Sequence, residues 1–185
     1  DLRVGSKGVN PVNLIAFNNQ LFFFAYEGSH DARYSGSLYK TDGTAAGTVK
    51  VKSVAHGSSY FNLRKASLVI GNTLYFTGYD NFNDVNLWKT DGTEAGTVKI
   101  KNIRQSTYDE VDGFTAMNGI LYFVARDDSH GLELWKSDGT EAGTILVKDI
   151  NPGGNDGGIG RMVAKGNELY FSADDGVHGT ELWKS

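Results

Sequence analysis

One segment of the sequence returns at a regular interval, and a chain of this kind must fold as copies of one supersecondary unit. The segment reads Leu-Trp-Lys-Ser-Asp-Gly-Thr-Glu-Ala-Gly-Thr at residues 134–144. Close copies occupy residues 38–48 and 87–97, and a fourth copy begins at Leu182, so the period is about 48 residues. This period is typical of propeller blades that contain four strands each.

Four strand signals recur within each period. The first is a short apolar run before a turn rich in Asn and Gly, which tolerate the positive φ of tight hairpins. The second follows at once and is apolar on both faces, as in a strand buried on both sides. The third is the Leu-Trp-Lys element, and the fourth carries Lys residues that suit an outer edge strand. The expected first strands are 14–17, 68–70, 114–117 and 162–164, the second 21–24, 74–77, 121–124 and 169–172, and the fourth 49–51, 98–100 and 145–147.

The two ends of the sequence complement each other. Residues 2–4 match a fourth strand, whereas Leu182 and Trp183 belong to a third strand that has no fourth strand after it. We therefore expect one all-β domain over residues 1–185, a closed four-bladed β-propeller with four strands per blade whose last blade is completed by the N-terminal strand. The alternative is part of a longer propeller or an open array. The expected blades cover about 11–53, 63–103, 112–150, and 160–185 with 1–5.

Composition excludes several classes of protein. The net charge of −4 is spread along the chain without a basic stripe, which argues against a nucleic-acid surface. No apolar run is long enough for a membrane span, and the absence of Cys excludes disulfides and thiolate metal sites.

A closed ring is compatible with a monomer, although exchange of the N-terminal strand between two copies would satisfy the same pairing.

The repeated residues have mechanical explanations. The Asp of each Asp-Gly-Thr turn is suited to accept backbone N–H bonds, and the Gly after it to adopt positive φ. The second Gly of each copy is expected to let the chain enter the next strand. The large aromatic residue of the third strand is expected to be a wedge between neighbouring blades. These aromatic residues are Tyr39, Trp88, Trp135 and Trp183.

The segment Glu133–Thr140 resembles the bacterial ELWxxDGT repeat, and the resemblance extends over all four periods. The copies that contain Tyr39 and Asn86 depart from the start of this motif. The resemblance implies a secreted or surface protein of bacteria, hence an extracellular or cell-surface location. It implies no enzymatic activity.

A column of acids and imidazoles recurs between the second and third strands of each blade. Acidic residues in such a column are candidate ligands of a hard cation, calcium being the candidate ion. The alternative is that the acids cap loop N–H groups and the imidazoles close the loops, which the recurrence in every blade favours. The pairs are Glu27 with His30, Asp80 with Asn83, Asp127 with His130, and Asp175 with His178.

Loops that differ between the repeats are expected on the same face of the propeller. Exposed aromatic and polar side chains on a rigid frame suit a sugar ring or a protein partner, although these loops are equally compatible with ordinary solvent-facing segments. The candidate ligand-binding residues are Tyr34, Tyr60, Phe61, Phe82, Tyr108, His130 and His178.

These observations favour a non-catalytic recognition or adhesion module that binds a glycan or a protein. The first strands present no ring of acidic, His or Arg residues along the axis, which argues against an enzyme. A structural spacer in a larger surface protein is the main alternative, and a glycan-acting hydrolase is a weaker one. A sialidase is disfavoured because the Arg residues fall at unrelated positions of the repeat.

Overall fold

The computed structural model describes residues 11–26, 35–56, 67–79, 84–105, 111–127 and 129–185. Within these ranges the chain is all-β and contains no helix. The strands are β1 (Val12–Phe17), β2 (Gln20–Tyr26), β3 (Ser35–Thr41), β4 (Val49–His56), β5 (Ser67–Ile70), β6 (Thr73–Tyr79), β7 (Asp84–Thr90), β8 (Val98–Gln105), β9 (Asp112–Met117), β10 (Ile120–Asp127), β11 (Gly131–Ser137), β12 (Ile145–Lys148), β13 (Val163–Lys165), β14 (Glu168–Asp174) and β15 (Thr180–Lys184).

The strands form four antiparallel sheets, and each sheet corresponds to one sequence repeat. We call them sheet 1 (β1–β4), sheet 2 (β5–β8), sheet 3 (β9–β12) and sheet 4 (β13–β15). Strands that are consecutive in the chain are neighbours in every sheet, so each sheet is an up-and-down meander. The strand order predicted from the repeat is confirmed, and sheet 4 contains three strands among the described residues.

The second and third strands are paired in the same register in every sheet. The aromatic residue of the third strand lies opposite a Phe of the second strand each time, so equivalent positions of the repeat are equivalent in space. These pairs are Phe23 with Tyr39, Phe76 with Trp88, Phe123 with Trp135, and Phe171 with Trp183.

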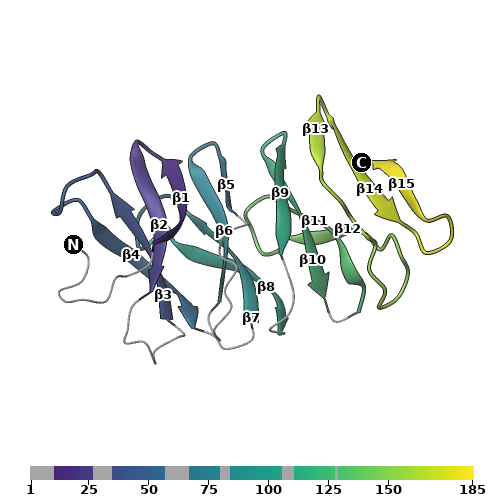
Figure 1. Cartoon of the computed structure of the whole chain (residues 1–185), viewed down its shortest axis with the longest axis horizontal. Helices are drawn as coiled ribbons and strands as arrows, with labels where there is room; N and C mark the ends of the chain where they lie inside the picture. The colour runs from purple at the N-terminus through teal and green to yellow at the C-terminus, as the bar shows by residue number, and fades with distance from the viewer. Residues whose placement is uncertain (1–10, 27–34, 57–66, 80–83, 106–110, 128) are drawn as a thin grey trace.

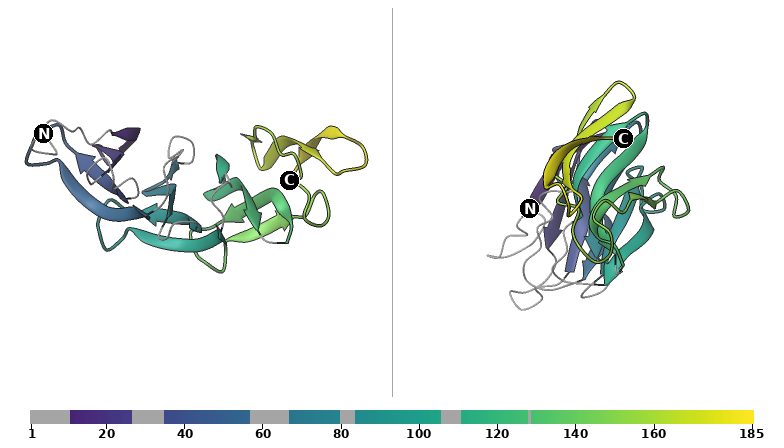
Figure 2. Two further views of the ribbon diagram at one scale, coloured as in Figure 1. Left: turned by 60° about the horizontal axis from the view of Figure 1, so that its bottom comes forward. Right: turned by 90° about the vertical axis from the view of Figure 1, so that its right-hand side faces the viewer.

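The four sheets stand side by side in chain order and form a curved row (Figures 1 and 2). Sheet 1 and sheet 4 lie at opposite ends of this row (Figure 1). The closed ring predicted from the sequence is therefore not confirmed, because the part of the chain that the structure describes forms an open row. Residues 2–4, which were expected to complete the last blade, lie outside the described residues.

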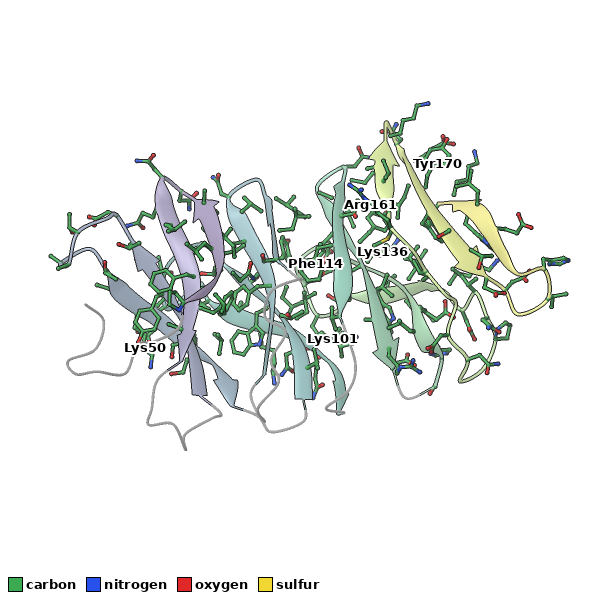
Figure 3. The ribbon with its side chains drawn as sticks, in the orientation of Figure 1. Lys50, Lys101, Phe114, Lys136, Arg161 and Tyr170 are labelled. Carbon is green, nitrogen blue, oxygen red and sulfur yellow. The ribbon has the colours of Figure 1, made fainter. Side chains whose placement is uncertain are left out.

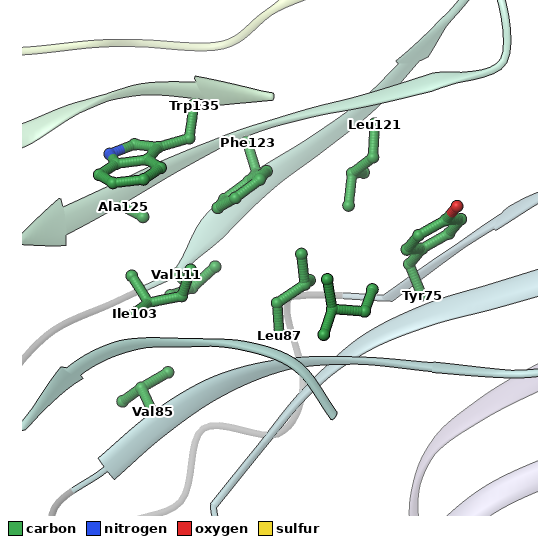
Figure 4. Close-up of a cluster of buried hydrophobic side chains, with 10 residues drawn as sticks. Tyr75, Val85, Leu87, Ile103, Val111, Leu121, Phe123, Ala125 and Trp135 are labelled. Atoms are coloured by element: carbon green, nitrogen blue, oxygen red, sulfur yellow. The ribbon is translucent and has the colours of Figure 1, made fainter. Parts of the chain in front are cut away.

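The hydrophobic core is divided into three clusters, one at each junction between consecutive sheets. At the second junction, Leu87 of sheet 2 packs with Leu121, Phe123 and Trp135 of sheet 3 (Figure 4). Trp88 occupies the equivalent place at the first junction, and Trp183 packs against the cluster at the third. The prediction that these Trp residues are wedges between neighbouring units is confirmed.

The tight turns follow the predicted chemistry. Asn18 and Asn19 have φ values of 48° and 57° between β1 and β2, and Asn118 and Gly119 have 53° and 79° between β9 and β10. Asn and Gly tolerate this left-handed region, which hairpins of two residues require. The sequence therefore places these hairpins correctly.

The Asp-Gly-Thr turn is held by a network that is the same in sheets 1, 2 and 3. In sheet 3, Asp138 Oδ1 accepts the Thr140 amide at 2.8 Å and the Thr140 hydroxyl at 2.7 Å. The Gly143 amide donates to that hydroxyl oxygen at 2.9 Å. A Cβ on Gly143 would lie 2.1 Å from Asp138 Oδ1, so the second Gly is needed because the carboxylate fills the place of its side chain. This close packing, which the sequence does not indicate, explains the residue better than the predicted entry into the next strand.

Candidate functional site

The two ends of the strands carry different connections, and we call each set of strand ends an edge of the row. In a meander of four strands, two connections lie at the same edge, which we call the loop edge. They are the connection between the second and third strands and the connection from the fourth strand to the next sheet. The other edge, the turn edge, carries the hairpins between the first and second strands and the Asp-Gly-Thr turns. The described segments of the loop edge are the β10–β11 loop, the β12–β13 loop (residues 149–162) and the β14–β15 loop (Figure 1).

Asp127 closes the β10–β11 loop through three contacts. Its Oδ1 accepts the amides of Ser129 at 2.8 Å and His130 at 2.7 Å. Its Oδ2 lies 2.7 Å from His130 Nδ1. Burial by itself raises the pKa of Asp127, but the hydrogen bonds from His130 and Ser129 outweigh it and hold the pKa below its usual value. The carboxylate is therefore ionised and fastened inside its own loop.

Asp175 makes the same contacts in the β14–β15 loop. Its Oδ1 accepts the amides of Val177 at 3.0 Å and His178 at 2.8 Å, and Oδ2 lies 2.8 Å from His178 Nδ1. The bond to the His178 ring, followed by the two amides, lowers the pKa of Asp175 far below its usual value. In return, the hydrogen bond to Asp175 raises the pKa of His178. Two successive repeats thus build one loop geometry from one sequence pattern.

These contacts favour the capping interpretation of the acid-and-imidazole column. Asp127 and Asp175 belong to different sheets, and each directs its oxygens to its own loop. Among the residues that the structure describes, no group of three or more His, Asp or Glu residues is arranged to hold a metal ion. The predicted calcium ligands Glu27 and Asp80 lie outside the described residues.

The remaining ligand-binding predictions are only partly represented. His130 and His178 lie on the loop edge, with side chains that are 38% and 71% exposed. The aromatic candidates all lie outside the described residues, so they remain predictions; they are Tyr34, Tyr60, Phe61, Phe82 and Tyr108.

A buried carboxylate that the sequence analysis did not single out anchors the longest described loop. Glu133 on β11 is fully buried and accepts the amides of Ile150 at 3.1 Å and Asn151 at 3.2 Å. Burial raises the pKa of Glu133; the two amides counteract the rise, and the nearby Asp149 and Asp156 add to it. The signal in the sequence was a polar residue before the Leu of each apolar third strand. The equivalent residues Ser37 and Asn86 are also buried.

The loop at residues 149–162 is fastened to the sheets on both sides of it. Arg126 forms an ion pair with Asp156, whose side chain also accepts the amide of Leu132 at 3.0 Å. The amide of Gly157 donates to the Leu132 carbonyl at 3.0 Å, and the Gly157 carbonyl accepts the amide of Asp174 in sheet 4 at 2.8 Å. The loop therefore joins sheet 3 to sheet 4 by backbone bonds and presents a fixed surface at the loop edge.

The described side chains at this edge offer hydrogen-bonding groups to a ligand. The ionised Asp127 and Asp175 are occupied by their loops, and their lowered pKa values do not suit a general acid. Glu133 has the raised pKa of a general acid, but it is fully buried against backbone amides. Exposed imidazoles, amides and carboxylates on fixed loops are suited to hydrogen bonding with a ligand.

Comparison with known proteins supports the fold alone. No family model and no curated protein matches the chain. The structure is similar to an acylaminoacyl peptidase from Pyrococcus horikoshii, with a TM-score of 0.54 and 14% identity over 94% of this chain and 25% of that one. The chain thus spans about a quarter of that peptidase, and the likeness supports a propeller-like fold of repeated antiparallel sheets.

Two further solved structures show weaker likeness. A puromycin hydrolase gives a TM-score of 0.47 and 12% identity over 95% of this chain and 30% of that one. An α-L-arabinofuranosidase from Clostridium thermocellum gives a TM-score of 0.38 and 13% identity over 88% of this chain and 59% of that one. Because both TM-scores are below 0.5, these likenesses carry no argument about this chain.

No helix in the described ranges has the length and apolar character needed to cross a membrane.

The two Asp–His pairs predict a measurable titration. The pKa of both imidazoles is raised in the folded protein. The two Asp–His contacts therefore stabilise the folded state fully below about pH 6.5, and this stabilisation is lost as the pH rises through the raised pKa. We expect NMR titration to give His130 and His178 pKa values above 6.5. Salt should reduce the shift more for His178, whose side chain is 71% exposed.

The isosteric variant Asp175→Asn is the control for this titration. It should return His178 toward its usual pKa and leave His130, in the neighbouring sheet, unchanged. If His178 already titrates at its usual value in the unmodified protein, the described Asp175–His178 contact is not formed in solution.

Proposed function

We propose that this chain is a non-catalytic recognition module, exposed outside the cell or on its surface, which binds a glycan or a protein through the loop edge. The observation that carries the proposal is the anchoring of the loops. Two Asp–His pairs and the buried Glu133 fix three consecutive loops on a frame of repeated sheets. Fixed polar loops reduce the conformational entropy that binding must remove, which favours recognition.

The same contacts weigh against the hydrolase alternative. A glycoside hydrolase needs one carboxylic acid with a raised pKa at the substrate and a second carboxylate beside it. Among the described carboxylic acids, Glu133 has a raised pKa but is fully buried, and Asp127 and Asp175 of the loops have lowered pKa values. A recognition role requires no such pair.

The direct test is binding of the purified chain to a broad glycan array, once with calcium and once with a chelator. Alanine variants of His178 and Asn155, which are exposed at the loop edge, should weaken the signal. The control is Glu141→Ala, an exposed position in the Asp-Gly-Thr turn at the turn edge, which should bind like the parent. A signal that survives chelation would establish recognition without the candidate calcium.

The result that contradicts the proposal is equally concrete. If the array gives no signal, capture of a surface protein of the native cells by the immobilised chain is the remaining form of recognition. Failure of both assays, or equal losses in loop-edge and turn-edge variants, would favour the spacer alternative.

A further inference from the structure

The β12–β13 loop is folded around one side chain, that of Glu133. The carboxylate accepts the amides of Ile150 and Asn151. Gly157 also packs against it, since a Cβ on Gly157 would lie 2.6 Å from Glu133 Oε2 and 2.8 Å from Oε1. The loop is closed further by Asn151 Nδ2, which donates to the Asp156 carbonyl at 3.1 Å. Glu133 is 0% exposed as a result, so its carboxylate has no access to water while the loop is closed.

The fold does not require an acid at this position. The equivalent third-strand residues of sheets 1 and 2 are the neutral Ser37 and Asn86, and both are buried. Glu181, the equivalent residue of sheet 4, is exposed. Among the described residues, Glu133 is thus the one buried acid of this column. Since an ionised carboxylate is costly to bury, its charge is a specific property of sheet 3.

The charged groups around Glu133 belong to the two neighbouring loops and to β10. Asp149 and Asp156 of the β12–β13 loop repel the ionised carboxylate, and His130 of the β10–β11 loop also interacts with it electrostatically. Two of these groups already have partners on β10, since Arg126 pairs with Asp156 and Asp127 with His130. The ionised form of Glu133 therefore meets two like charges whose repulsion a proton on Glu133 would remove.

The other cations of these elements do not offset this repulsion. Lys136 on β11 and Arg161 at the end of the loop lie above the loop edge in Figure 3. Lys148 on β12 is placed over the Trp183 ring, 4.8 Å from its centre. In contrast, Asp149 Oδ1 is buried without a hydrogen-bond partner among the described residues. A protonated Glu133 gains an O–H donor, for which this nearby oxygen is an available acceptor.

We propose that Glu133 is a proton-controlled latch of the β12–β13 loop. When the carboxyl group is protonated, the loop stays closed around it. When the group is ionised, the loop opens more often, because opening returns the charge to water and separates it from Asp149 and Asp156. This response belongs to the loop itself and requires no ligand, so it is independent of the recognition role proposed above.

The direction of the response follows from the pKa of Glu133, which burial raises above its usual value of 4.5. The closed loop binds the proton more tightly than the open loop does. The stabilisation of the closed loop is therefore complete below about pH 4.5 and is lost as the pH rises through the raised pKa. Between these two values the ratio of open to closed loop should increase by up to about tenfold per pH unit, the slope of a single proton.

Hydrogen exchange followed by NMR measures the opening. The reporter is the amide of Gly157, whose bond to the Leu132 carbonyl holds the loop against β11. After correction for the intrinsic exchange rate, the protection of this amide should fall with rising pH along that slope. Val124 and Leu134 face each other in the β10–β11 ladder, and their amides should be better protected than that of Gly157. Equal protection would mean that the loop opens only with the whole sheet, which excludes a latch.

Glu133→Gln removes the titrating group and keeps the size of the side chain. The protection of the Gly157 amide should lose its slope in this variant. The matched control is Glu141→Gln, which removes an exposed acid of the Asp-Gly-Thr turn and should keep the slope. A parent without the slope, or a slope that survives Glu133→Gln, would overturn the proposal. If Glu133→Gln does not fold, Glu133→Asn replaces it, because sheet 2 buries Asn86 at this position.

His130 titrates beside the same loop, so the comparison of Glu133 with Gln is repeated in the His130→Gln background. The difference between Glu and Gln should persist there, and its disappearance would assign the response to the imidazole instead. A ¹³C titration of the Glu133 carboxyl group in the unmodified protein depends on no variant. Its midpoint should lie above 4.5, and a midpoint at or below 4.5 would contradict the latch.

Discussion

Trp135→Ala is expected to lower the free energy of unfolding by about 3–5 kcal/mol, the usual cost of truncating a buried aromatic residue. Trp135 is 7% exposed and packs in the second junction with Phe123 of its own sheet and Val85 of sheet 2. The cavity would open in the apolar contact between sheets 2 and 3. Chemical denaturation followed by far-ultraviolet circular dichroism measures the effect without relying on Trp fluorescence.

Two control variants separate packing from hydrogen bonding. Trp135 Nε1 is buried without a hydrogen-bond partner among the described residues, so Trp135→Phe should lose much less stability than Trp135→Ala. Trp183→Ala should also cost less, because Trp183 is only partly buried at the end of the row. Equal losses for Trp135→Ala and Trp183→Ala would contradict this account, because the loss would then not follow the burial of the Trp side chain.

Gly131→Ala is expected to cost about 2–4 kcal/mol, near the upper end for single substitutions. Gly131 has a φ of 70°, in the region that side chains disfavour. An added Cβ would also lie 1.9 Å from the Asn155 carbonyl oxygen, a backbone atom that cannot turn aside. The loop at residues 149–162 would have to move away from β11, and its bond from Gly157 to Leu132 would be lost.

Gly154→Ala is the matched control because it lies in the same loop. A Cβ on Gly154 would meet nothing within 4 Å, and its φ is not in the left-handed region. This variant should melt at or slightly above the temperature of the parent, because Ala restricts the unfolded chain. The account of the loop would be wrong if Gly131→Ala and Gly154→Ala had the same midpoint of unfolding.

The strands, hairpins and aromatic wedges were predictable because the sequence states each of them several times. A short run such as 21–24 is ambiguous alone, but its recurrence with one turn chemistry fixes both the element and its neighbours. The capping interpretation of Asp127 and Asp175 was accessible for the same reason, since the acid and imidazole lie three residues apart and meet within a single loop.

Contacts between distant residues were not predictable in this way. Glu133 meets amides that follow it by 17 and 18 residues, and no local pattern specifies that distance. The packing of Asp138 against Gly143 was missed because the motif permits several explanations of its second Gly. In both cases the cause is how closely two backbone segments approach each other.

The sequence by itself determined that the chain is a series of antiparallel meanders with an aromatic wedge at each junction. Only the tertiary structure decided how the sheets are placed, because the shape of a repeat array depends on the small rotation between neighbours added over all junctions. Residues at one junction do not reveal that sum. For this reason the closed ring was a reasonable expectation from the complementary ends, whereas the described chain is an open, curved row (Figures 1 and 2).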